Sequence, residues 1–399
     1  MISPPDYFHP IREKAVQRWN QLENDKELAG PWIQLFQQVQ SPRHGVSELL
    51  QNADDAGASE ASVKITDGYF VFEHNGEDFT EDHFASLCKF GYSNKRFLHT
   101  IGFRGIGFKS VFSLGETIEL FSPTLSIKYH RDRFTQPEWI EPIGSDDNLT
   151  SVRVKIEDNH REKELRKNLH EWIGNPYSLL FFKCIRRINF ESEIVHWIED
   201  SPGPVKNSVW MQQDRNPDEK ILHIKSDPLT FPKEAIDEIR KERTGSSESD
   251  LQLPKCEIDL LLGAKGKLYV VLPTQVRTDL PFAINAPFIQ DPARLKIKDP
   301  ETSATNRWLL SEAGKLAAET MIHWLNNNEL KLRNRSDAYD ILTDIDKEDD
   351  DDSIETSCGE LVEKEFITIA NDHPIVLADD GLVVEVNEAI VLPKAIHRG

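Results

Sequence analysis

The chain has few cysteines, and their spacing rules out both a disulfide framework and a zinc site. Cys88, Cys184, Cys256 and Cys358 lie far apart and form no CxxC pair, a usage typical of a reducing compartment. No apolar run approaches the 18 residues that a membrane helix needs, and the N-terminus lacks the basic and apolar regions of a signal peptide. We therefore expect a soluble, cytoplasmic protein with no membrane partner.

Basic residues are also in deficit. Lys and Arg number 47 against 68 Asp and Glu in 399 residues, a formal net charge of −21. Such a surface repels the phosphate backbone of nucleic acids, so direct DNA binding is disfavoured. The length predicts two to three domains, each with a core of its own.

Helical and strand patterns are mixed along the chain, which predicts the α+β class. Apolar spacing indicates helices at 7–39, 45–57, 80–90, 102–113 and 302–326. Alternation indicates strands at 61–66, 69–73, 117–121, 125–130, 151–156, 256–262 and 267–272. Asp67-Gly68 is a strong hairpin signal between the first two strands, and Thr80 is a helix N-cap residue.

Composition suggests four segments. We expect a first domain over 1–200 and a second α/β domain over 201–335, whose first part, 201–250, is polar and reads as irregular. An acidic linker follows over 336–356, and a further β-rich segment begins at 357–399.

Three polar residues share one face of the helix expected over 45–57. Glu48, Asn52 and Asp55 stand at i, i+4 and i+7, so their side chains project together. Mg2+ prefers oxygen ligands and keeps several waters, so the Asn52 carbonyl with substrate phosphates is a sufficient set, leaving Glu48 to orient a water.

Two glycine-containing motifs follow in order. His74-Asn75-Gly76 ends a strand, and the passage from Gly102 to Ser110 contains Gly102, Gly105 and Gly107 before Phe108 and Lys109. Glycines let backbone amides approach an anion. The passage is not a Walker A loop, because Phe108 separates Gly107 from Lys109 and no strand of the required type precedes it.

In their order and spacing, these three motifs resemble the GHKL ATPase superfamily, which includes the heat-shock protein 90 chaperones, DNA gyrase, sensor histidine kinases and MutL. The sacsin-type branch is the most similar, since its helix motif and its continuation Gly-Phe-Lys-Ser are alike. The resemblance covers about residues 30–160. It implies a Bergerat two-layer α/β sandwich followed by an α/β middle, transducer-like domain, with ATP and Mg2+ as ligands.

The resemblance also implies residue roles. Glu48 is similar to the general base, Asn52 to the Mg2+ ligand and Asp55 to a supporting hydrogen-bonding residue. Gly76, beside Asn75, would lie under the adenine. Thr150 would bind adenine through a water molecule. The residues that would hold the phosphates are Gly102, Gly105, Gly107, the backbone amide near Phe108, and Lys95 in the lid.

His74 departs from the family pattern. It stands where relatives have an Asp that accepts a hydrogen bond from the adenine amino group. An imidazole can accept through one nitrogen but has no fixed anionic oxygen. A strand-end histidine without ligand contact is the alternative interpretation.

The second half adds one catalytic candidate. The segment from Leu268 to Arg294 resembles the part after the ATPase domain in sacsin-type proteins, and in chaperone relatives a middle domain sends an Arg to the γ-phosphate. Arg294 is the candidate, followed by Lys296 and then Gln275; a surface basic cluster is the simpler alternative.

The predicted function is thus slow, Mg2+-dependent ATP hydrolysis in which lid closure acts as a conformational switch, with a homodimer or larger complex as partner and a chaperone-like or bacterial defence role. Two alternatives stay open: a nucleotide sensor or scaffold without turnover, and a DNA-acting ATPase of the MutL or MORC type.

Overall fold

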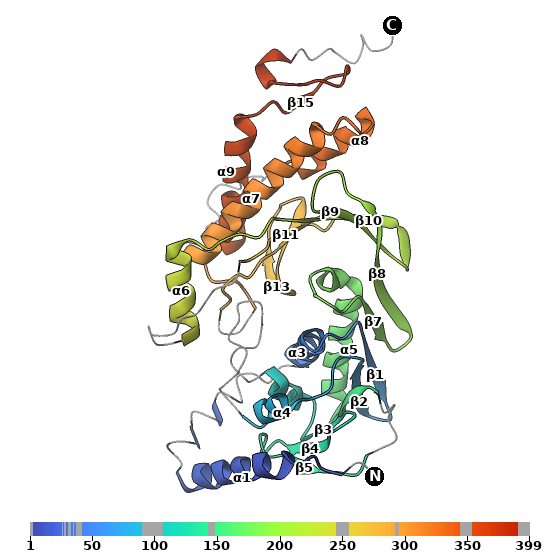
Figure 1. Cartoon of the computed structure of the whole chain (residues 1–399), viewed down its shortest axis with the longest axis vertical. Helices are drawn as coiled ribbons and strands as arrows, with labels where there is room; N and C mark the ends of the chain where they lie inside the picture. The colour runs from blue at the N-terminus through green and yellow to red at the C-terminus, as the bar shows by residue number, and fades with distance from the viewer. Residues whose placement is uncertain are drawn as a thin grey trace. The chain divides into compact units, whose positions relative to one another are not determined.

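The computed structural model describes residues 3–25, 27, 29–30, 33–34, 36, 42–89, 107–142, 148–244, 255–291, 295–343 and 353–389. The chain divides into two compact units (Figure 1). The first comprises Met1–Ile198 with Gln213–Arg215, and the second comprises Glu199–Gln212 with Asn216–Gly399. Both mix helices and strands, as the helical and strand patterns of the sequence predict.

The first unit contains one sheet and the helices that cover it. Its elements are α1 (Phe8–Asn24), α3 (Pro42–Asp55), β1 (Glu60–Thr66), β2 (Tyr69–His74), α4 (Glu81–Leu87), η1 (Gly107–Ser113), β3 (Thr117–Phe121), β4 (Ser126–His130), β5 (Glu138–Trp139), β6 (Thr150–Lys155), α5 (Asn159–Gly174), η2 (Pro176–Leu180), β7 (Arg187–Phe190) and the start of β8 (Glu193–Pro202). The strand order is β8-β7-β1-β2-β6-β3-β4-β5.

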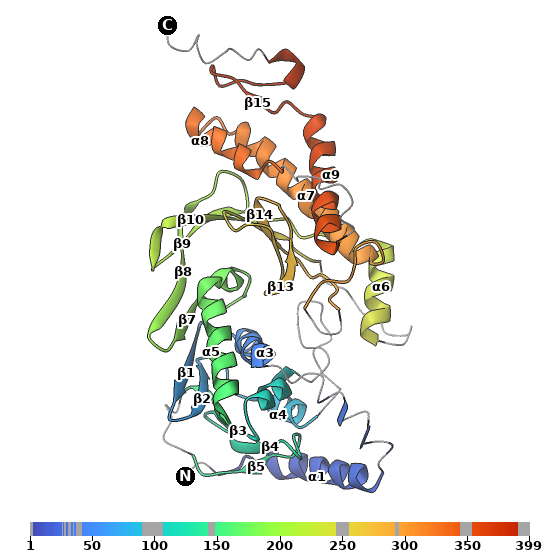
Figure 2. The same cartoon turned by 180° about the vertical axis from the view of Figure 1, so that it is seen from behind.

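All neighbouring strands of this sheet with a determined register are antiparallel except β1 and β7, which run parallel. Helices α3 and α5 lie side by side against the sheet (Figures 1 and 2). The core face carries Phe70 and Phe72 of β2 and Val152 and Val154 of β6, all buried. Since α3 buries Val46, Leu49, Leu50 and Ala53, it is held there by its apolar face.

Local sequence signals place several elements correctly. Asp67 and Gly68 both have positive φ (51° and 77°), as the two central residues of a tight hairpin turn require. Thr80 caps α4 by accepting a hydrogen bond from the backbone N–H of His83 at 3.2 Å. The described part of the helix expected at 102–113, residues 107–113, is instead the short 3-10 helix η1.

Helix α1 packs on its own unit. Its buried residues Phe8, Ala15, Trp19 and Leu22 recur at helical spacing, and Trp19 Nε1 donates to Thr135 Oγ1 at 2.8 Å. The helix therefore covers part of the core, as an ordinary amphipathic helix does.

The second unit combines a second set of strands with the longest helices. Its elements are the end of β8, β9 (Ser208–Gln213), β10 (Asn216–Lys225), α6 (Lys233–Thr244), β11 (Asp259–Leu262), β12 (Lys267–Val270), β13 (Leu272–Arg277), β14 (Phe282–Asn285), α7 (Ala304–Leu325), α8 (Leu332–Ser336), η3 (Asp337–Ile341), α9 (Ile354–Asn371), β15 (Val376–Leu377), β16 (Val383–Val384) and η4 (Val386–Glu388). The strand order is β9-β10-β11-β14-β12-β13, and β15 pairs only with β16.

The prediction that residues 201–250 are irregular is wrong for the residues that the structure describes there. They contain β9, β10 and α6. Leu222 and Ile224 of β10 are buried against β11, where they pair with Leu262 and Leu260. Charged residues flank this short apolar run and make the composition of the segment polar. The strand forms nevertheless, because its apolar residues are buried in a sheet.

The prediction that residues 357–399 are rich in strands is also wrong for the start of that range, which is helical. Helix α9 continues to Asn371 and buries Cys358, Val362, Phe366 and Ala370, four residues apart each time. This face packs on α7, where Gly314 leaves room for the backbone of Val362. The acidic residues 344–352 of the expected linker lie outside the described part of the chain. No helix among the described residues is long and apolar enough to cross a membrane.

Candidate functional site

Three motifs that are separate in the sequence meet around α3 in the first unit. Gly76 lies against the end of α3, where an added Cβ would stand 2.8 Å from the carbonyl oxygen of Ala56. Gly45 near the start of α3 lies against η1, with Val111 Cα 3.5 Å from its ideal Cβ position. The helix, the turn after β2 and the segment after Gly107 therefore form one region.

On α3 the three predicted residues differ in exposure. The Glu48 side chain is buried, that of Asn52 is half-buried, and that of Asp55 is exposed. Burial of a carboxylate such as that of Glu48 costs free energy. Proteins keep such a buried carboxylate where it has interaction partners or a function.

The turn after β2 is rigidly held. Asn75 Oδ1 accepts from the backbone N–H groups of Ser59 and Glu60 at 2.9 and 3.0 Å, and its Nδ2 donates to Ser59 Oγ at 2.8 Å. The Glu77 N–H donates to the Ala56 carbonyl at 2.7 Å. The Asn75 side chain thus fastens the turn to the segment between α3 and β1, which gives it a positioning role.

His74 and Thr150 stand opposite each other where β2 and β6 meet. They are register partners, so their side chains share one face of the sheet. Both are buried, and Thr150 Oγ1 has no hydrogen-bond partner among the residues that the structure describes. Burial lowers the pKa of His74 to about 4, so the imidazole is neutral near pH 7.

The last described motif begins at Gly107, the first residue of η1. Phe108 packs edge-on against Tyr129 with ring centroids 6.1 Å apart. The remaining predicted residues of this motif, Gly102 and Gly105, lie outside the described residues, as do Lys95 and Arg294.

Lys109 is a buried cation to which the sequence assigned no role of its own. It is 1% exposed, and its Nζ lies 4.2 Å from the ring centroid of Tyr129 with no hydrogen-bond partner within the described chain. Burial lowers the pKa of Lys109 to about 7. The sequence offered no signal for this, because nothing in the motif distinguishes an inward from an outward lysine.

Asp54 is a second residue that the sequence did not single out. Its carboxylate accepts from the backbone N–H groups of Lys183, Cys184 and Ile185 at 3.0, 2.7 and 3.0 Å. The partners lie about 130 positions away in the chain, so no local pattern could reveal them. Asp54 anchors α3 to the segment before β7, whereas the neighbouring Asp55 faces outward.

In the second unit, the described residues beside Arg294 are held by backbone contacts. Asp291 Oδ1 accepts from the N–H groups of Leu295 and Lys296 at 2.8 and 3.0 Å, and the Gln275 N–H donates to the Leu295 carbonyl at 2.7 Å. Lys296 Nζ pairs with Glu355 at 3.1 Å. The Lys296 ammonium therefore already has an acidic partner on α9.

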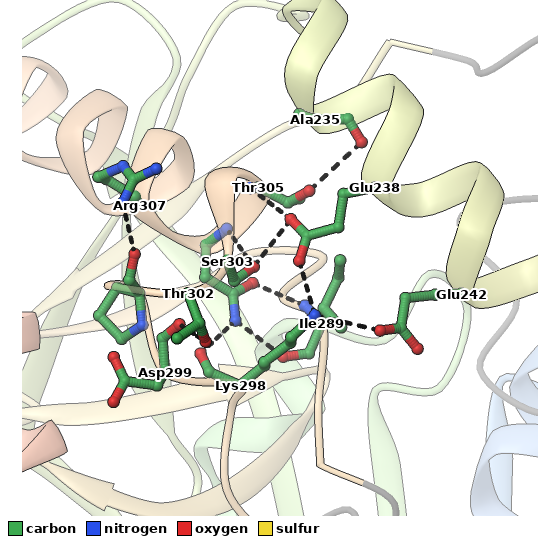
Figure 3. A network of polar contacts seen from close by, with 12 residues as sticks. Ala235, Glu238, Glu242, Ile289, Lys298, Asp299, Thr302, Ser303, Thr305 and Arg307 are labelled. Atoms are coloured by element: carbon green, nitrogen blue, oxygen red, sulfur yellow. Dashed lines mark hydrogen bonds and ion pairs between the residues drawn. The ribbon is translucent and has the colours of Figure 1, made fainter.

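A polar cluster fixes the start of α7 in the same unit (Figure 3). Glu238 of α6 accepts from the Thr305 N–H at 2.9 Å, the Ser303 hydroxyl at 3.0 Å and Lys298 Nζ at 3.0 Å. Asn306 donates to the carbonyls of Ile289 and Lys298 at 2.8 and 2.7 Å and accepts from the Ile289 N–H at 2.7 Å. Both polar atoms of the Asn306 side chain therefore make hydrogen bonds.

No protein-family model and no curated protein sequence matches the chain. No group of three or more His, Cys, Asp or Glu residues suited to a metal ion occurs in the described residues. A Mg2+ ion bound mainly through substrate phosphates needs only one or two protein oxygens, and the half-buried Asn52 on α3 offers such a donor.

Proposed function

We propose that the first unit binds a nucleoside triphosphate with Mg2+ and hydrolyses it slowly, ATP being the nucleotide that the resemblance to GHKL ATPases implies. The observation that carries this proposal is the convergence on α3 of the turn at 74–76 and the segment from Gly107. The finer assignment, a Bergerat two-layer sandwich, belongs to the same proposal.

Glu48 is the proposed general base. A carboxylate activates a water by accepting its proton as the water attacks the γ-phosphate. Its buried position on α3 limits competition from bulk solvent.

Asn52 is the proposed Mg2+ ligand, one helical turn from Glu48. The ion, when bound, neutralises charge on the phosphate oxygens. The turn at 74–76 would hold the base end of the nucleotide, and Gly76 allows this turn to pack directly on the residues at the end of α3.

The test is steady-state phosphate release from Mg–ATP by the wild type, Glu48→Gln and Asn52→Ala, with EDTA as a further arm. We expect Glu48→Gln to lose about 100-fold or more in rate with nucleotide affinity retained, because only proton transfer is removed. Asn52→Ala should lose Mg–ATP affinity. The exchange Glu164→Gln at an exposed position of α5 is the matched control.

Normal turnover in Glu48→Gln contradicts the base assignment. Binding without phosphate release in the wild type points instead to a nucleotide sensor that does not hydrolyse its ligand.

A further inference from the structure

Lys109 of η1 is a lysine in the interior of the first unit. Its side chain is 1% exposed, and Nζ has no hydrogen-bond partner among the residues that the structure describes. The rings of Tyr129 and Phe108 lie beside it, with centroids 4.2 and 5.1 Å from Nζ. A contact with an aromatic ring stabilises a buried ammonium group only in part, so the charged form of Lys109 is poorly accommodated.

The ionisable groups around Lys109 are neutral or positive. Directly after α4, the Cys88 thiol shares a hydrogen bond with the Tyr129 hydroxyl at 3.5 Å, and burial raises the pKa of the thiol to about 11 and that of Tyr129 well above its usual range. The charges that act most strongly on this thiol are the cations of Lys109, Arg18 and Lys89, and Arg18 of α1 donates to the Cys88 carbonyl at 3.0 Å. A negative group at Nζ would therefore have cations nearby.

Burial also makes the amine of Lys109 reactive. It lowers the pKa of Lys109 to about 7, so about nine in ten of these side chains are uncharged at pH 8, whereas an ordinary lysine is almost entirely charged. Only the uncharged amine has the lone pair that attacks an electrophile. The electrophile must be small and apolar to reach a side chain that is buried beside aromatic rings. Carbon dioxide meets both conditions and can enter through local openings of the native state.

We propose that Lys109 is a carboxylation site, at which the side-chain amine reacts with carbon dioxide to form a carbamate. The Nζ lone pair attacks the carbon atom of CO2, an N–C bond forms, one C–O π bond opens to give an oxygen anion, and a proton leaves the nitrogen for the solvent. The side chain becomes an anion beside cations. Of the Tyr129 hydroxyl and the Cys88 thiol, either can donate a hydrogen bond to it. This modification lies beyond the nucleotide function proposed above and does not depend on it.

The test uses isotopically labelled CO2 and the whole chain. The protein is equilibrated with labelled bicarbonate at pH 8 and at pH 6, at the same concentration of dissolved CO2, and is then treated with an alkylating oxonium salt that converts a carbamate into a stable ester. Mass spectrometry of the digested protein locates the ester. Lys155, an exposed lysine on β6, is the internal comparison, and Lys109→Met and Lys155→Met are the matched variants.

We expect label on the peptide that contains Lys109 at pH 8 and at least about tenfold less at pH 6, because the uncharged share of the amine falls by about that factor. The peptide that contains Lys155 should carry little label at either pH. Because CO2 reacts preferentially with the folded state, bicarbonate should raise the midpoint of thermal unfolding of the wild type above its value in sodium chloride of the same ionic strength. Lys155→Met should keep this increase, and Lys109→Met should lose it.

Two outcomes overturn the inference. Absence of a carbamate on Lys109 at pH 8 with saturating bicarbonate excludes the modification. Equal labelling of Lys109 and Lys155 would mean that burial plays no part and that any surface amine reacts in the same way. Labelling of the wild type alone decides between these results if Lys109→Met does not fold.

Discussion

The two units differ in how completely their buried polar groups are satisfied. In the second unit, the cluster at the start of α7 uses every donor and acceptor of Asn306, and His223, Asp259 and Asn285 are linked at 2.8 Å. In the first unit, Thr150 Oγ1 and Lys109 Nζ have no hydrogen-bond partner among the described residues.

The contrast extends beyond these residues. Across the described residues, buried side-chain nitrogen and oxygen atoms that lack a hydrogen bond lie in the first unit, with Thr343 Oγ1 as the exception. Since an unsatisfied buried group is costly, a water molecule or a ligand that bonds to such an atom would stabilise the protein. The satisfied clusters hold the fold, whereas the unsatisfied atoms have hydrogen-bonding capacity left over.

The largest effect is expected where a satisfied carboxylate is removed from the first unit. Asp54→Ala leaves three backbone N–H groups without their acceptor and should lower the free energy of unfolding by about 3–4 kcal/mol. The neighbouring exchange Asp55→Ala, at an exposed position, should change it by less than about 0.5 kcal/mol. Urea denaturation of both variants measures the difference, and equal effects would remove the distinction between the two residues.

Asn306→Ala probes the satisfied cluster of the second unit. It breaks three hydrogen bonds at a site that is fully buried, so we expect a loss of about 2–3 kcal/mol in the same assay. A loss below about 1 kcal/mol would mean that the cluster contributes little to holding α7.

Lys109→Met tests the opposite case, a buried ammonium group without a hydrogen-bond partner among the described residues. Because the pKa of Lys109 is depressed from 10.5 to about 7, the folded protein below pH 7 holds a charged, buried amine, and wild-type stability rises as pH increases from about 7 toward 10.5. The variant should therefore be more stable by about 1–2 kcal/mol at pH 6.5. The gain should shrink at pH 9, and a gain that does not depend on pH would exclude the charge as its cause.

Thr150→Val should have the smallest effect on the free protein. It removes a hydroxyl that bonds to nothing in the described chain and keeps the side-chain shape, so the free energy of unfolding should change by no more than about 0.5 kcal/mol. Thermal unfolding without ligand checks this. A large loss would show that the hydroxyl has a structural partner.

The sequence predicted best where the signal was local. Asp67-Gly68 defines a turn through its backbone conformation, and Thr80 defines a helix cap through its side-chain hydroxyl. It failed where burial by distant elements decides: β10 is a short apolar run among charges, and α9 owes its burial to α7. For the same reason it could not separate Asp54 from Asp55, since the partners of Asp54 lie at 183–185.

Hydrogen exchange with and without Mg2+–ATP tests the central claim most directly. The account predicts slower exchange in peptides covering 74–80 and 148–152, where unfilled groups of the first unit would gain partners, and unchanged exchange in peptides covering 300–310, where the second unit is already satisfied. Unchanged exchange at 74–80 and 148–152 with saturating ligand would contradict it.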